Sequence, residues 1–194
     1  TVNIEDLSKM ISYSSCAELE TILNEAAINA AFERKESIGM NDLVKSVLRM
    51  QYDSLDNYTK ATAKDLKKTA LHEAGHLVVS EVLEPCSVGM ASLRSTGRNS
   101  KGGFIHLCKE LSRRPYQILI SLAGKAAVEL YYSETCASGC QSDIARAFNL
   151  IRDGLSESAT HGFGMIDVAT RRFIDTSESM NSRTEAVTQA ELER

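Results

Sequence analysis

Hydrophobic residues recur every three or four positions over residues 4–52, which is the spacing of short amphipathic helices. The strongest pattern covers residues 14–35, SSCAELETILNEAAINAAFERK. Ser14 or Ser15 can cap this helix, and Glu18 follows at the spacing of a capping box. The face predicted to be buried consists of Leu19, Ile22, Leu23, Ala26, Ala27 and Ala30.

A third helix is predicted just after Gly39, over DLVKSVLRM, with Asn41 as its cap. The next stretch, residues 53–64, is polar and weakly periodic, and we place a domain boundary there. The predicted division is a helical subdomain over residues 1–55 and a second domain over residues 65–194.

The second domain opens with a long apolar pattern that begins near Asp65 and ends before Pro85. Its predicted inward face consists of Leu71, Ala74, Val78 and Val82. The segments CSVGMASLR and GGFIHLC look like strands on either side of a polar loop. Two further helices are predicted, over PYQILISLAGKAAVELYY and over DIARAFNLIRDGL with Ser142 as its cap. The fold class is therefore mainly α, with a small β-sheet.

Composition narrows the function classes. The net charge of −4 and the pI of about 5.6 give no sign of the basic surface with which proteins bind nucleic acids. No run of 18 apolar residues occurs and the first residues do not resemble a signal peptide, so neither a membrane span nor a leader is predicted. Five scattered cysteines favour a reducing compartment.

The long helix of the second domain contains HEAGH, residues 72–76. Residues four apart lie one above the other on a helix, so His72 and His76 can point both imidazoles at one Zn²⁺ ion. Glu73 lies about 100° further around the helix, where it can take a proton from a zinc-bound water without binding the metal itself. Gly75 in mid-helix suggests that another backbone packs closely there.

A catalytic zinc needs a third protein ligand and one open position. The metzincin extension of the motif is excluded, because Val79 and Val82 occupy the positions of its glycine and its third histidine. Among the acidic residues downstream, two remain candidates. Glu129 lies on a predicted helix, and Asp143 begins a helix directly after a glycine turn.

Residues 69–168 resemble the peptidase domain of the FtsH family of ATP-dependent zinc metalloproteases. Besides HEAGH, the stretch LAGKAAVEL is similar to the family's L-G-G-R-A-A-E-E-L, SGCQSDIARA to its T-G-A-x-x-D-L-x-R-A, and GFGM to its W-G-M. The resemblance implies that Asp143 is the third zinc ligand, beside His72 and His76, and that Glu73 is the catalytic base.

Residues 3–52 resemble the helical lid that ends the AAA+ ATPase module of the same family. The similar stretches are YSSCAELETILNEAAINAA and IGMNDLVKSV. The resemblance implies a homo-hexameric protease that degrades unfolded or membrane proteins with ATP. It would be anchored on the cytoplasmic side of a membrane, or at an organellar equivalent, through segments outside this chain. The chain has no G-x-x-x-x-G-K-[ST] motif, so ATP is expected to act only in the parent enzyme, and the C-terminal helices of the family peptidase are mostly missing.

Two departures from the family pattern keep an alternative open. Cys16 stands where the lid usually has glycine, and Val128 replaces a usual glutamate. A catalytically inactive scaffold for ring assembly is therefore the second hypothesis. On the strand GGFIHL, His106 is interpreted as a strand residue and not a ligand, and the strand itself could pair with an extended substrate.

Overall fold

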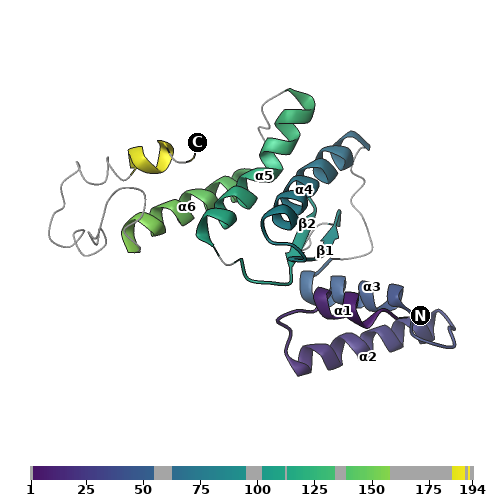
Figure 1. Ribbon diagram of the computed structural model, residues 1–194. Coiled ribbons are helices and arrows are strands. Elements are labelled where there is room, and N and C mark those ends of the chain that lie inside the picture. Colours follow the sequence, from purple (N-terminus) through teal and green to yellow (C-terminus); the bar gives the residue numbers. More distant parts are fainter. Residues whose placement is uncertain are drawn as a thin grey trace.

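The structure is a computed structural model that describes residues 2–54, 63–94, 102–111, 113–133, 139–157, 185–190 and 192. Along the chain it contains helices α1 (Ile4–Met10), α2 (Cys16–Phe32), α3 (Met40–Tyr52) and α4 (Ala63–Leu83), strands β1 (Val88–Ser92) and β2 (Phe104–Leu107), and helices α5 (Arg114–Tyr132) and α6 (Gln141–Glu157) (Figure 1). The predicted fold class, mainly α with a small sheet, is confirmed.

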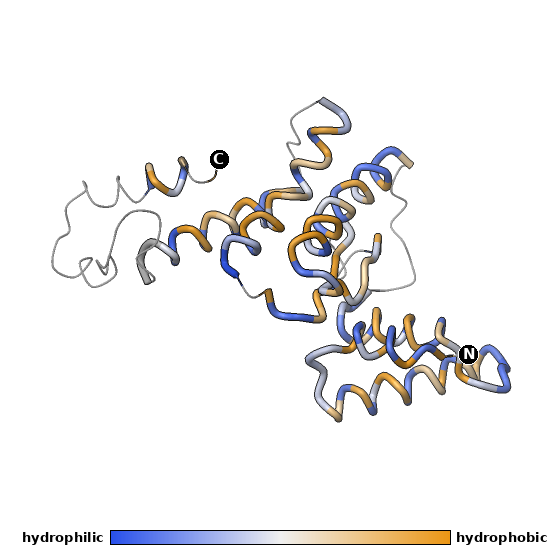
Figure 2. Tube along the Cα trace, viewed as in Figure 1, coloured by the Kyte–Doolittle hydropathy of each residue, from blue (hydrophilic) through white to orange (hydrophobic). Residues whose placement is uncertain are grey.

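Helices α2 and α3 pack against each other through small and branched apolar residues. Hydrophobic and hydrophilic residues alternate along α2 in Figure 2, and its buried members are Ile22, Ala26 and Ala30. On α3 the buried apolar residues are Leu43, Val47 and Leu48. A capping box between Ser15 and Glu18 begins α2, as the sequence predicts.

The cap of α3 differs from the prediction. Gly39, not Asn41, precedes the helix, and Asp42 at the third helical position accepts a hydrogen bond from the Gly39 backbone N–H at 2.9 Å. The Asp42 carboxylate is fully buried and also pairs with Lys35 at 2.5 Å. Because the helix begins at Met40, Asn41 lies inside its first turn and cannot be the residue that caps it.

Helices α4, α5 and α6 pack together, and α5 lies between the other two (Figure 1). The approach of α4 to α5 is close because Gly75 has no side chain. A Cβ atom there would lie 2.5 Å from the Ala123 backbone oxygen and 2.7 Å from the Ala127 Cβ. The close packing expected from Gly75 is therefore confirmed.

The predicted inward face of α4 is wrong. Val78 and Val82 are 55% and 74% exposed, whereas His76 and Ser80 are buried. The helix turns its polar and small residues toward α5, so its apolar periodicity does not mark the buried side. The predicted cap of α6 is also wrong, because that helix begins at Gln141 and Ser142 lies inside its first turn.

The two strands form an antiparallel sheet in which Met90 stands opposite His106 and Ser92 opposite Phe104. The sheet contacts α4 on one side and the C-terminal end of α1 on the other. The predicted domain boundary lies mostly in residues 55–62, outside the described residues. None of the helices in the described ranges is both long enough and apolar enough to cross a membrane.

Candidate metal centre

Three side chains from two helices converge beside α5. His72 and His76 come from consecutive turns of α4, and Asp143 comes from the first turn of α6. Asp143 Oδ2 lies 3.1 Å from His72 Nε2 and 3.5 Å from His76 Nε2, and the two Nε2 atoms are 3.0 Å apart. Within the described part of the chain, they are the one group of at least three His, Cys, Asp or Glu side chains close enough to share an ion.

These spacings fit a small tetrahedral cation. Ligand atoms about 2.0–2.1 Å from a tetrahedral ion lie about 3.3 Å from each other. The three observed separations, 3.0, 3.1 and 3.5 Å, bracket that value. Two imidazole nitrogens and one carboxylate oxygen are also a donor set that zinc accepts.

The orientation of His76 is set by the backbone of α5. Its Nδ1–H donates to the Ile120 carbonyl oxygen at 2.6 Å, and only 7% of the residue is exposed. With the proton held at Nδ1, the Nε2 lone pair of the neutral ring points toward Asp143 and His72. A backbone partner of this kind is the usual way in which a metal-binding histidine is fixed in one tautomer.

Electrostatics favour a cation or a proton among these groups. Burial of His76 lowers its pKa, but the hydrogen bonds to Asp143 and to the Ile120 carbonyl, together with the charges of Asp143 and Glu73, outweigh burial, so the pKa is raised overall. Burial raises the pKa of Asp143, yet hydrogen bonds and charges from both histidines hold it well below its ordinary value. The carboxylate therefore stays ionised and attracts positive charge.

Gly124 on α5 makes room for the two histidine rings. A Cβ atom at this position would lie 2.5 Å from His76 Nε2 and 2.6 Å from His72 Cε1. Sequence reasoning gave this glycine no role of its own, although it lies inside LAGKAAVEL. A glycine in the middle of a long helix was the signal, as it was for Gly75.

Glu73 lies beside the cluster and against the start of β2. A Cβ atom on Gly103 would be 2.7 Å from Glu73 Cγ, so the strand forms a wall next to this side chain. Burial raises the pKa of Glu73, the charges of His72 and His76 lower it, and Asp143 raises it, with a net upward shift. An upward shift moves the pKa of a carboxylate toward the pH at which an enzyme works, which favours its use as a general base.

The other residues considered as metal ligands, Glu129 and His106, lie outside the cluster of His72, His76 and Asp143. Glu129 pairs with Lys125 at 2.5 Å along α5 and is not part of the His72–His76–Asp143 cluster. His106 is on β2, as predicted, with its ring nitrogens next to Ser12 and Tyr52.

No model of a known protein family matches the chain. Individual proteins do. The ATP-dependent zinc metalloprotease FtsH 1 of Thermomicrobium roseum is 31% identical over 171 residues, which cover 84% of this chain and 25% of the relative. The ATP-dependent zinc metalloproteases FtsH of Thermus thermophilus and Thermotoga maritima are each 32% identical over 80% of this chain, and over 26% and 27% of their own lengths.

The chain thus spans about a quarter of the length of the curated relatives it matches. The similarity runs over most of this chain and agrees with the resemblance in HEAGH and the motifs that follow it. Over about four fifths of its length, the chain is homologous to a part of the ATP-dependent zinc metalloproteases of the FtsH family.

Proposed function

We propose that the chain is the zinc endopeptidase part of a longer ATP-dependent protease, with His72, His76 and Asp143 as the zinc ligands. The observation that carries this proposal is the convergence of three ligand atoms at 3.0–3.5 Å, with the His76 tautomer fixed by Ile120. A bound zinc would act as a Lewis acid on the scissile carbonyl and would lower the pKa of a water molecule.

Glu73 is the proposed general base. Its carboxylate removes a proton from the attacking water and then delivers this proton to the nitrogen of the leaving amine. The position next to His72 on α4 and the raised pKa support this role. The cluster and Glu73 together supply the residues that a peptide hydrolysis of this type requires.

The proposed substrate is an unfolded polypeptide in extended conformation. In the described residues β2 pairs only with β1, and the proposed substrate would form backbone hydrogen bonds along the second edge of β2. The strand begins next to Gly103, which lies against Glu73. Pairing with a strand edge recognises backbone rather than side chains, which suits a protease of broad specificity.

The remaining properties come from the family resemblance and from the names of the relatives. The relatives are named as ATP-dependent, and residues 3–52 resemble the lid of an AAA+ module. We infer that the parent protein is a homo-hexamer that feeds substrates to this site with ATP. We also infer that it is membrane-anchored through other segments, with this part on the cytoplasmic side or at an organellar equivalent.

The test compares two single substitutions in the full chain. Glu73→Gln should keep zinc and lower cleavage of casein by about 10²–10⁴-fold, the usual contribution of a general base. Glu129→Gln is the matched control, because it removes the same charge from a residue outside the cluster, and it should keep both zinc and cleavage.

Each outcome has a clear meaning. Cleavage retained in Glu73→Gln would rule out Glu73 as the base. Loss of zinc in Glu129→Gln would move the third ligand away from Asp143. A wild-type chain that neither takes up zinc nor cleaves casein would favour the inactive scaffold.

A further inference from the structure

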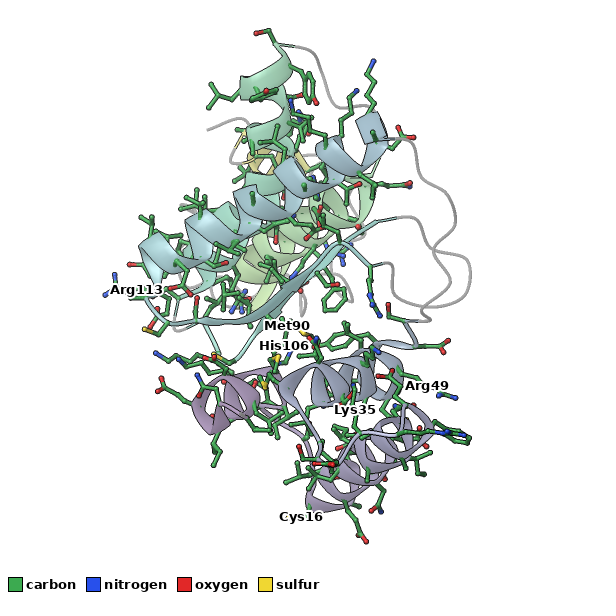
Figure 3. All side chains as sticks on the ribbon, turned by 90° about the vertical axis from the view of Figure 1, so that its right-hand side faces the viewer. Cys16, Lys35, Arg49, Met90, His106 and Arg113 are labelled. Atoms are coloured by element: carbon green, nitrogen blue, oxygen red, sulfur yellow. The ribbon has the colours of Figure 1, made fainter. Side chains whose placement is uncertain are left out.

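The ring of His106 connects strand β2 to the N-terminal helices, which are α1, α2 and α3 with the turns that follow them. Its Nε2 lies 2.7 Å from Ser12 Oγ, in the turn after α1, and its Nδ1 lies 2.7 Å from the hydroxyl of Tyr52, the last residue of α3. Both ring nitrogens therefore have partners from the N-terminal helices. In Figure 3, Met90 and His106 lie where the sheet meets these helices.

An aromatic stack adds a second contact at the same place. The ring of Tyr52 lies on that of Phe104, with centroids 4.2 Å apart and planes inclined by 22°. Burial raises the pKa of Tyr52, so its hydroxyl stays protonated and able to donate. One residue of α3 thus contacts two alternate positions of β2, Phe104 and His106, whose side chains share one face of the strand.

The neighbouring strand is held in the same way. A Cβ atom on Gly89 of β1 would overlap the backbone oxygen of Lys9 near the end of α1. The sheet and α1 therefore meet backbone to backbone, and a larger residue at position 89 would separate them. Both strands of the sheet are fixed against the N-terminal helices.

The same sheet touches the proposed catalytic base at its other side. Gly103, directly before Phe104, lies against Glu73 Cγ, and its missing side chain also leaves room for the Ser92 backbone oxygen. A continuous path of contacts therefore runs from Tyr52 to Phe104, along one peptide bond to Gly103, and on to Glu73.

We propose that Tyr52 and Ser12 are positioning residues for the peptidase site, which hold β2 in place through His106 and Phe104 and thereby keep the Gly103 wall against Glu73. The inference rests on the proposed function, because it takes Glu73 as the base. A movement of the N-terminal helices would be passed to the active site through this strand, independently of any nucleotide chemistry.

The expected loss of kcat follows from the sensitivity of catalysis to the positions of the reacting groups. A displacement of about 1 Å in an active site can lower the rate about 100-fold. Tyr52→Ala removes the stack and the hydroxyl, and we expect kcat to fall at least about tenfold. Tyr52→Phe keeps the stack and loses one hydrogen bond, so its kcat should fall only about two- to tenfold.

The experiment measures three quantities in the full chain: zinc content, kcat for casein, and hydrogen exchange of the β2 amides over residues 104–107. Tyr52→Ala should keep zinc, lower kcat and speed exchange in β2 but not in α5 and α6, and Tyr52→Phe should show the same changes to a smaller degree. Phe32→Ala is the matched control, because this aromatic residue of α2 is 84% exposed, and it should behave as wild type. Should Tyr52→Ala fail to fold, Ser12→Ala replaces it, with Ser8→Ala on exposed α1 as its control.

Unchanged kcat and unchanged β2 exchange in Tyr52→Ala would overturn the inference. So would a loss of kcat that merely follows a loss of zinc, since the role would then be structural. An inactive wild-type chain would instead overturn the proposed function, and the exchange data, which need no activity, would still decide whether the N-terminal helices hold β2.

Discussion

The two halves of the molecule, helices α1–α3 and helices α4–α6 with the sheet, differ in the kinds of side chain that they bury. Between α2 and α3 the contacts are mainly apolar, with Ile22 and Val47 almost completely buried, beside one hydrogen bond from Asn29 to the buried Ser46. On α4 the buried residues are polar, His76 and Ser80, and they face a mixed side of α5 that buries Ser121 and Gly124 beside Ile120, Ala123 and Val128. The two helices approach closely at Gly75 and Gly124. The first half obtains its stability from side-chain packing, whereas the second uses close backbone contact to place a polar cluster. A change in the apolar contacts between α2 and α3 should therefore lower stability but leave zinc binding by the second half intact.

The largest effect is expected for Gly124→Ala. Its Cβ would lie 2.5–2.7 Å from atoms of both histidine rings, so the rings must move and the ligand atoms separate. We expect zinc affinity to fall by up to about 100-fold, measured by competition with a chelating dye. Gly39→Ala is the control, because its Cβ would meet only Asp42 Oδ2 at an ordinary 3.5 Å. Unchanged zinc affinity in Gly124→Ala would remove the distinction between the two halves.

Truncating a buried side chain between α2 and α3 should lower the stability of the protein and leave zinc binding unchanged. Ile22 is 1% exposed, and Ile22→Ala should lower the free energy of unfolding by about 2–5 kcal/mol, measured by urea denaturation. Zinc per chain should stay at the wild-type value. The neighbouring Leu23 is 42% exposed, so Leu23→Ala should cost much less. Loss of zinc in Ile22→Ala would contradict the independence of the two halves.

The affinity for zinc should depend on pH through His76 in the second half. At the proposed site zinc would compete with protons for His76, whose pKa is raised above its ordinary value mainly by Asp143 and the Ile120 carbonyl. Zinc affinity should therefore fall as pH decreases from 8 to 6, by about tenfold per pH unit for each proton released on binding.

The metal-free protein should show the reverse trend. A raised histidine pKa contributes stability that is complete below the unfolded value of about 6.5 and is lost as pH rises through the folded pKa. Thermal unfolding at pH 6, 7 and 8, with and without zinc, tests both signs. The same trend with and without the metal would contradict the assignment of His76.

The smallest effect is expected at the cap of α2. Ser15→Ala removes the side chain that accepts from the Glu18 backbone N–H, and this should cost about 1 kcal/mol of unfolding free energy. Thr21→Ala, on an exposed turn of the same helix, is the control. A cost well above that of Ile22→Ala would mean that caps, not the apolar contacts, stabilise this half.

The same contrast explains what the sequence could predict. The helices of the apolar half follow from periodicity and capping chemistry, since burial there is apolar. On α4 the identical method selected Val78 and Val82, which are exposed, because the buried side carries His76 and Ser80. Hydrophobic periodicity identifies a buried face only where that face is hydrophobic.

The site itself was partly accessible from the sequence. The spacing of His72, Glu73 and His76 indicates a shared face on a helix, but spacing alone left Glu129 and Asp143 both open as the third ligand. Only the packing of α6 against α5 brings Asp143 to the histidines, and no local pattern encodes that contact. The role of Gly124 also depends on the distance between two helices, which a single sequence does not contain.

The central claim is that His72, His76 and Asp143 bind one zinc ion. The most direct test is zinc per chain in wild type, Asp143→Ala and the control Asp153→Ala, a carboxylate on the same helix that lies near Arg152. We expect about one zinc in wild type and in the control, and little in Asp143→Ala. Equal zinc in Asp143→Ala and wild type, or none in wild type after metal is supplied, would contradict it.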